Sequence, residues 1–233
     1  MIGKLIVKLD IIDSTNNYLK KQDELFNDGT VVVAKTQTAG RGRSNHQWVS
    51  EEGNLYFSFL VKRNISRNKI FTFTVLTSMA VINLLKKYEI IGSIKYPNDI
   101  LVNNQKICGI LIESSGSKEL EYVVVGVGFN VNQLDFKDLN QVAVSLRQVT
   151  NKEYEIKEIF TNFIKEYNLL EQSDFTTVFQ EYLNYSIIIN QKVKIAEEIY
   201  QIMKITETGE VRVKSRDNKK ELILNRVDYK ELF

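Results

Sequence analysis

The apolar segment at residues 70–88 constrains the fold more than any other feature of the sequence. Its apolar side chains fall on nearly every side of a helix, and a helix of this kind lies inside a core. The chain has 233 residues, enough to cover such a helix and to leave room for a small appended module. The apolar residues are Phe71, Phe73, Val75, Leu76, Met79, Ala80, Ile82, Leu84 and Leu85.

Shorter apolar segments before and after this helix have the two-residue period or the β-branched content of strands. The turn Asn103-Asn104-Gln105 separates two of them and predicts a hairpin. Helical spacing returns at residues 156–170 and 175–185, so strands and helices are mixed along the chain. The expected strands are residues 5–9, 30–35, 54–61, 93–96, 100–102, 106–113 and 122–131.

After Ser186 the apolar period changes to two, which predicts a second structural unit made of short strands. Turn residues at Glu207-Thr208-Gly209 and Arg216-Asp217-Asn218 separate these strands. Short strands at this spacing favour a small β-barrel. We therefore expect two domains, residues 1–186 and residues 187–233.

Composition excludes several classes of function. With 31 basic and 29 acidic residues the formal charge is +2, which disfavours a dedicated nucleic-acid binder. One cysteine, Cys108, and one histidine, His46, exclude an internal disulfide, a cysteine zinc cluster and multi-histidine metal sites. The first residues lack the apolar region of a signal peptide, and we identify no apolar run of about 20 residues for a membrane span. We expect a cytoplasmic protein without membrane contact.

Residues 37–53 show no regular period, and loops of this length inside a domain are usually functional or disordered. Within them Gly40-Arg41-Gly42-Arg43 alternates flexible glycines with permanently charged arginines. Glycines let backbone N–H groups converge on an anion, and arginine binds carboxylate or phosphate through a planar fork. The segment predicts a loop that closes over a negatively charged small molecule, with a solvated basic turn as the alternative.

Three later segments add polar groups at strand ends. In Lys95-Tyr96-Pro97-Asn98-Asp99 the proline ends a strand, so Asn98 and Asp99 face a cleft or solvent, although the same residues also suit a plain turn. Lys106 opens an apolar strand that contains Gly109, and it suits an anion or an exposed strand edge. Gly126 and Gly128 leave one strand face without side chains, which predicts a floor for a flat ligand beside Asn130.

Taken in order, these segments resemble the biotin–protein ligase family, also called biotin–[acetyl-CoA-carboxylase] ligase. The resemblance runs from about residue 9 to the C-terminus, nearly the whole chain, and five motifs carry it. They are Ser14-Thr15-Asn16, the Gly-Arg-Gly-Arg of 40–43, Lys-aromatic-Pro-Asn-Asp at 95–99, Lys-x-x-Gly-Ile-Leu-x-Glu at 106–113 and Gly-x-Gly-x-Asn-x-Asn at 126–132.

The resemblance implies an α+β catalytic domain, related to class II aminoacyl-tRNA synthetases, that binds biotin and ATP on a mixed sheet. A small SH3-like β-barrel would follow it. The implied reaction joins biotin to ATP as biotinyl-5′-AMP and then transfers biotin to a lysine of a biotin carboxyl carrier protein or domain. ATP and Mg²⁺ act as co-substrate and activator, and no tightly bound cofactor is implied.

By motif match the resemblance also implies residue roles. Biotin would be bound by Ser14, Thr15, Asn16, Gln37, Gly40, Arg41, Gly42, Arg43, Lys106, Gly109, Gly126 and Gly128. The nucleotide would be bound by Arg43, Trp48, Asn98, Lys106 and Asn130. Catalysis would fall to Lys106, Asp99, Arg41 and Arg43, with Asp99 also able to help hold Mg²⁺.

Two departures from the family pattern stand out. Residues 44–47, Ser-Asn-His-Gln, replace a run that commonly carries another basic residue and a glycine, and Tyr96 stands where tryptophan is more usual. The family pattern begins almost at Met1, so we expect a monofunctional enzyme without a DNA-binding domain, and the sequence leaves dimerisation open. The alternatives are a lipoate–protein ligase of the same superfamily and, from another class, an RNA-binding module.

Overall fold

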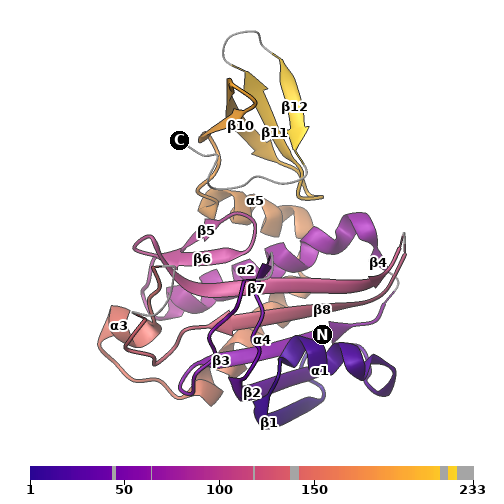
Figure 1. Cartoon of the computed structure of the whole chain (residues 1–233), viewed down its shortest axis with the longest axis vertical. Helices are drawn as coiled ribbons and strands as arrows, with labels where there is room; N and C mark the ends of the chain where they lie inside the picture. Colours follow the sequence, from indigo (N-terminus) through magenta and orange to yellow (C-terminus); the bar gives the residue numbers. More distant parts are fainter. Residues whose placement is uncertain (44–45, 64, 118, 137–141, 216–219, 225–233) are drawn as a thin grey trace.

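The computed structural model describes residues 1–43, 46–63, 65–117, 119–136, 142–215 and 220–224. Its main element is an eight-stranded sheet in the order β1-β2-β3-β8-β7-β6-β5, with β4 paired to β8 (Figure 1). β1 and β2 run parallel and the other neighbours run antiparallel, so the sheet is mixed. The strands are β1 (Ile6–Ile12), β2 (Val31–Gln37), β3 (Leu55–Val61), β4 (Ile65–Ser66), β5 (Ser93–Lys95), β6 (Asp99–Val102), β7 (Gln105–Gly116) and β8 (Glu119–Phe129).

Helices cover both faces of this sheet. On one face lie α2 (Ile70–Lys87), α4 (Ile156–Gln172) and α5 (Phe175–Tyr185). α1 (Thr15–Lys21) covers the other face, where Leu19 packs in a smaller apolar cluster with side chains of β2, β3 and β8. All seven residues of β3 are buried because the strand is covered on both sides, which explains its continuous apolar run.

The apolar helix expected at residues 70–88 is confirmed as α2. By length and composition the helical stretch Arg67–Lys87 could span a membrane, contrary to our expectation that no run approaches that length. However, 72% of its most apolar 18 residues is buried inside the protein. It is therefore the central core helix of the fold, as its all-round apolar surface predicts.

The hairpin at residues 103–105 is confirmed and is tighter than expected. β6 ends at Val102 and β7 begins at Gln105, which leaves a two-residue loop of Asn103 and Asn104. Both asparagines have positive φ, 51° and 61°, as a type I′ turn requires. The short helix α3 (Leu146–Thr150), two 3₁₀ turns (Asp23–Leu25 and Arg67–Lys69) and β4 were not predicted.

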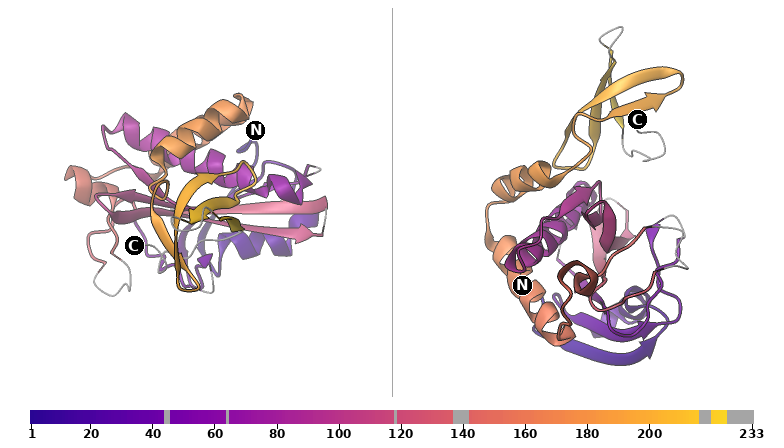
Figure 2. Two further views of the ribbon diagram at one scale, coloured as in Figure 1. Left: turned by 90° about the horizontal axis from the view of Figure 1, so that it is seen from above. Right: turned by 90° about the vertical axis from the view of Figure 1, so that its left-hand side faces the viewer.

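The C-terminal strands form a separate four-stranded antiparallel sheet in the order β12-β11-β10-β9. This sheet stands beyond α5 at one end of the molecule (Figure 2). The turn at 207–209 is confirmed, whereas the turn expected at 216–218 lies outside the described residues. The boundary at residue 186 remains a prediction. The strands are β9 (Lys192–Ile195), β10 (Glu198–Ile205), β11 (Val211–Ser215) and β12 (Glu221–Leu224).

Candidate functional site

The start of α1 forms a buried hydrogen-bonded cluster with the middle of the sheet. The hydroxyls of Thr15 and Ser58 lie 2.7 Å apart, and Ser58 donates to Oδ1 of Asn16 at 2.5 Å. The side-chain oxygen of Gln37 accepts from the backbone N–H of Thr15 at 2.9 Å. A Cβ atom added at Gly126, beside Ser58 in the sheet, would lie 2.1 Å from Asn16 Oδ1. The cluster therefore requires glycine at that position.

A carboxylate from β7 closes this cluster. Glu113 accepts hydrogen bonds from Asn16 at 2.8 Å and from Lys20 at 2.6 Å, and it pairs with Arg41 at 3.2 Å. Burial would raise the pKa of Glu113, but the bonds from Lys20 and Asn16 and the charge of Arg41 together hold it below its usual range. Arg41 also donates to the side chain of Asn17 at 3.1 Å. Arg41, the first arginine of the loop, therefore lies close to the start of α1.

The loop that carries the two arginines is folded back on itself. Trp48 donates its backbone N–H to the carbonyl of Gly40 at 2.9 Å, and single bridges join Gln37 to Ser50 and Arg41 to Gln47. A Cβ at Gly40 would lie 2.2 Å from the Trp48 carbonyl, so this close approach requires glycine. Residues 44 and 45, which depart from the family pattern, lie outside the described residues.

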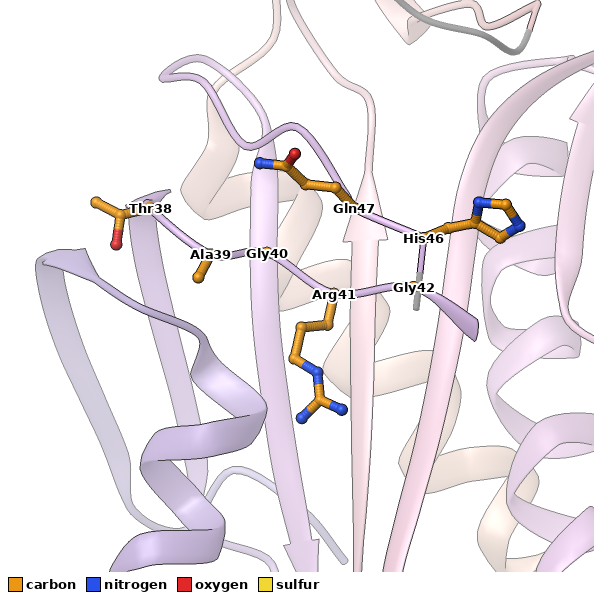
Figure 3. A pocket seen from close by; sticks show the side chains of 7 residues that line it. All are labelled: Thr38, Ala39, Gly40, Arg41, Gly42, His46 and Gln47. Carbon is orange, nitrogen blue, oxygen red and sulfur yellow. The ribbon is translucent and has the colours of Figure 1, made fainter. Parts of the chain in front are cut away.

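A pocket lies along the described part of this loop (Figure 3). The side chain of Arg41 extends away from the loop backbone, whereas those of His46 and Gln47 point to other sides. Gly42 donates its N–H to the His46 carbonyl at 2.7 Å, which brings the two limbs of the loop together. The lining residues are Thr38, Ala39, Gly40, Arg41, Gly42, His46 and Gln47.

Of the two glycines predicted to form a floor for a flat ligand, Gly128 lies against the indole of Trp48, whereas Gly126 lies against Asn16. Cβ atoms added at Gly128 and Gly109 would lie 2.4 Å and 2.7 Å from ring atoms of Trp48. The ammonium of Lys106 stands 5.0 Å from the ring centroid, within cation–π range. The indole N–H of Trp48 is buried and has no hydrogen-bond partner among the described residues. At Gly109 and Gly128 the two strands therefore lie against an aromatic side chain of the protein itself, and a flat ligand on this floor remains a prediction.

A second polar cluster lies on the Lys106 side of this tryptophan. Lys106 pairs with Asp99 at 2.8 Å, and their side chains are only 16% and 17% exposed. Arg43 donates to Oδ1 of Asn98 at 2.8 Å, while the amide nitrogen of Asn98 donates to the Ile110 carbonyl at 2.5 Å. The structure therefore gathers three cations, Arg41, Arg43 and Lys106, around the loop that carries Trp48.

Asn130 and Ser14, both predicted to contact a ligand, form hydrogen bonds to neighbouring parts of the protein. The amide of Asn130 donates to the carbonyls of Lys106 and Val144, at 3.3 and 3.2 Å, and so supports the backbone of Lys106. Ser14 is 2% exposed and occupies the N-cap position of α1, and its backbone N–H donates to Oδ1 of Asp13 at 2.8 Å. Their expected contacts with nucleotide and biotin remain predictions.

Sequence reasoning assigned no role to Ser58 or Glu113. Ser58 is the only serine among the aromatic and aliphatic residues of β3, and a buried hydroxyl needs a partner. That isolated polar residue was the signal that could have identified it. Glu113 was part of a quoted motif, but only the fold brings it within reach of α1 and Arg41.

The sequence matches a known protein family. Residues 9–130, just over half of the chain, match the biotin/lipoate A/B protein ligase family. The chain belongs to this family. Among curated relatives, the bifunctional ligase/repressor BirA of Bacillus spizizenii is 34% identical over 208 residues, covering 83% of this chain and 63% of the relative. The biotin–protein ligase of Schizosaccharomyces pombe is 29% identical, covering 83% of this chain and 36% of the relative.

Solved structures agree with the family assignment. The biotin protein ligase of Aquifex aeolicus in complex with biotin and ATP superposes with a TM-score of 0.72 at 26% identity, over 95% of this chain and 99% of that chain. Another structure of that ligase has a TM-score of 0.76 at 24% identity, over 100% of this chain and 98% of that chain, which supports the fold. The expected α+β fold class, a mixed sheet with helices followed by a small β unit, is thereby confirmed.

Proposed function

We propose that this protein is an ATP-dependent biotin–protein ligase. The observation that carries the proposal is that the loop at residues 37–53 contacts two polar clusters. One lies at the start of α1, and the other contains Asp99 and Lys106. The neutral groups of Thr15, Asn16 and Gln37 suit the ureido ring of biotin, which both donates and accepts hydrogen bonds. Arg43 and Lys106 on the other side of that loop, together with Arg41 near the start of α1, suit a carboxylate and a phosphate.

The first step joins two anions. An oxygen of the biotin carboxylate attacks the α-phosphorus of ATP, and the bond from that phosphorus to pyrophosphate breaks. Arg41, Arg43 and Lys106 offset the repulsion between the two anions and the charge that develops on the phosphoryl oxygens. Because the resulting anhydride hydrolyses readily, the folded loop also serves to exclude water. No nucleophilic side chain of the protein is needed.

The second step transfers the acyl group. The amine of an acceptor lysine attacks the carbonyl carbon of the biotinyl group, AMP leaves, and the amine loses a proton. Asp99 lies beside Lys106 at the start of β6, where a carboxylate can orient the amine and accept its proton. The acceptor in this proposal is a lysine of a biotin carboxyl carrier protein or domain.

Magnesium enters as part of the substrate. The described residues contain no group of three or more histidine, cysteine or acidic side chains that could hold a metal. Mg²⁺ is commonly held by one or two carboxylates together with substrate phosphates, and Asp99 fits that donor set. We therefore assign MgATP as the co-substrate, with Asp99 as the protein residue available to the ion.

Biotin-dependent exchange between pyrophosphate and ATP tests the proposal. We expect exchange with biotin and little with lipoate, because the loop and the Asp99–Lys106 pair match the biotin branch of the family. Transfer is then measured on a purified carrier domain, with its target lysine changed to arginine as the control. Exchange with lipoate alone would assign the chain to the lipoate branch. Binding of RNA with a steep salt dependence, without exchange, would favour the RNA-binding alternative.

A further inference from the structure

We propose that Glu113 is a positioning residue of the biotin site, which fixes the amide of Asn16 and holds Arg41 against the start of α1. This inference deepens the proposed function and rests on it for the identity of the ligand. Glu113 itself stands behind the residues that would contact biotin. Its side chain is 19% exposed and has three partners, one from the helix body, one from the helix start and one from the loop.

The orientation of the Asn16 amide follows from Glu113. Ionised Glu113 only accepts hydrogen bonds, so the group of Asn16 that faces it at 2.8 Å must be the NH₂. The carbonyl oxygen of Asn16 then faces Ser58, whose hydroxyl donates to it at 2.5 Å. A rotated amide would place oxygen against carboxylate and would leave the Ser58 hydroxyl facing NH₂. The negative charge of Glu113 thus selects one of two arrangements of a predicted biotin contact.

The position of Arg41 follows from the same carboxylate. The same oxygen, Oε1, receives Lys20 at 2.6 Å and Arg41 at 3.2 Å. Lys20 belongs to α1, so its contact joins helix to sheet, whereas the Arg41 contact joins the loop to the sheet. Asn17 gives Arg41 a second acceptor at 3.1 Å. Of these two side-chain contacts of Arg41, with Glu113 and with Asn17, neutralising Glu113 would leave only the contact with the Asn17 amide at full strength.

Comparing Glu113→Gln with a control variant separates the positioning role of Glu113 from an effect on the stability of the fold. Glu113→Gln removes the charge but keeps the size of the side chain. Glu121→Gln is the matched control, because Glu121 lies on the adjacent strand β8, is exposed, and accepts a bond from Ser115 at 2.9 Å. Thermal unfolding of both variants checks that they fold. Glu113→Asp keeps the charge with a shorter reach and should give an intermediate effect in each measurement below.

The first measurement needs no assumption about activity. Limited trypsin digestion without ligands, with the cut sites identified by mass spectrometry, should cleave after Arg41 several-fold faster in Glu113→Gln than in the wild type. The Glu121→Gln control should match the wild type. Equal cleavage of Glu113→Gln and wild type would overturn the proposal that Glu113 holds Arg41 in place.

The second measurement addresses the ligand. In the exchange assay the KM for biotin should rise about tenfold or more in Glu113→Gln, in line with a lost charge-assisted contact. The KM for MgATP should change less than the KM for biotin. An unchanged biotin KM, or an equal rise for both substrates, would overturn the assignment to the biotin site. If the wild type shows no exchange, the proposed function fails, and the digestion alone decides whether Glu113 holds Arg41.

Discussion

The hydroxyl of Tyr96 donates a hydrogen bond to the backbone carbonyl of Gly209, and this bond joins the large sheet to the C-terminal sheet. Burial raises the pKa of Tyr96 to about 12, so the hydroxyl stays protonated and able to donate at neutral pH. Gly209 has a φ of +85°, and a Cβ there would lie 2.9 Å from the ring of Phe71. The C-terminal turn at Gly209 is therefore seated against Tyr96 and Phe71.

Changing Tyr96 to phenylalanine should lower the free energy of unfolding by about 0.5–1.5 kcal/mol, because one buried hydrogen bond is lost. Gly209→Ala should cost about 1 kcal/mol or more, since it adds both backbone strain and a contact with Phe71. Urea denaturation measures both values. If Gly209→Ala were as stable as the wild type, the turn would not be seated against Phe71.

Lys106→Met should slow biotin-dependent exchange about ten- to a hundred-fold, because a charge-assisted contact with the reacting anions is lost. The variant should remain folded, since methionine keeps most of the apolar stem. Lys194→Met is the matched control, an ion-paired lysine on β9 in the C-terminal sheet. Normal exchange by folded Lys106→Met would remove Lys106 from the site.

Asp99→Asn should impair transfer at least as much as adenylate formation. The amide cannot accept the proton of the incoming amine, and Lys106 loses its partner at 2.8 Å. Single-turnover transfer from preformed biotinyl-5′-AMP to a carrier domain isolates the second step. Unchanged transfer with lost adenylate formation would instead assign Asp99 to MgATP.

The loop at residues 37–53 should be cut by trypsin after Arg41 and Arg43 in the free protein, and biotin with MgATP should slow this cleavage several-fold. Bound anions would add a charged partner to the Asn98 contact of Arg43 and to the Glu113 and Asn17 contacts of Arg41. Biotin alone should protect less, because it supplies no phosphate. Cleavage that is equal with and without ligands would mean that the loop does not close over them.

The stability of the protein should fall in acid partly through Glu171. Burial would raise the pKa of Glu171, but hydrogen bonds from the N-terminal ammonium and Arg63 hold it below the ordinary 4.5. A carboxyl with a lowered pKa stabilises the fold above its unfolded pKa, and this contribution is lost as the pH falls through the folded pKa. The difference in unfolding free energy between wild type and Glu171→Gln, about 1–2 kcal/mol, should therefore be largest above pH 4.5 and shrink below it. A difference independent of pH would contradict the assignment.

Local signals were enough to predict most regular elements. The helix α2 follows from its own spacing, and the turn at Asn103 and Asn104 follows from residues that tolerate positive φ. α3 was missed because it has only five residues, although Ser145 and Gln148 form a capping box that the sequence carries as Ser-x-x-Gln.

The fold of the arginine loop could not be read from its sequence. Thr38 and Ala39 donate to the carbonyls of Ile12 and Asp13, both at 2.8 Å, so residues distant in the chain hold the start of the loop. The same limit applies to the site. The motifs identified which residues matter, but the contact of Glu113 with Arg41 depends on how β7, α1 and the loop meet.

Trp48 is the only tryptophan in the sequence, and it lies on Gly109 and Gly128. Its N–H is buried, and no hydrogen-bond partner for it lies in the part of the chain that the structure describes. Trp48 is therefore an intrinsic fluorophore at the centre of the candidate site. Indole emission is sensitive to hydration and to neighbouring charge, and the Lys106 ammonium is 5.0 Å from the ring centroid. Every change in tryptophan fluorescence reports on this one place, so ligand entry and loop movement can be followed in real time without an added dye.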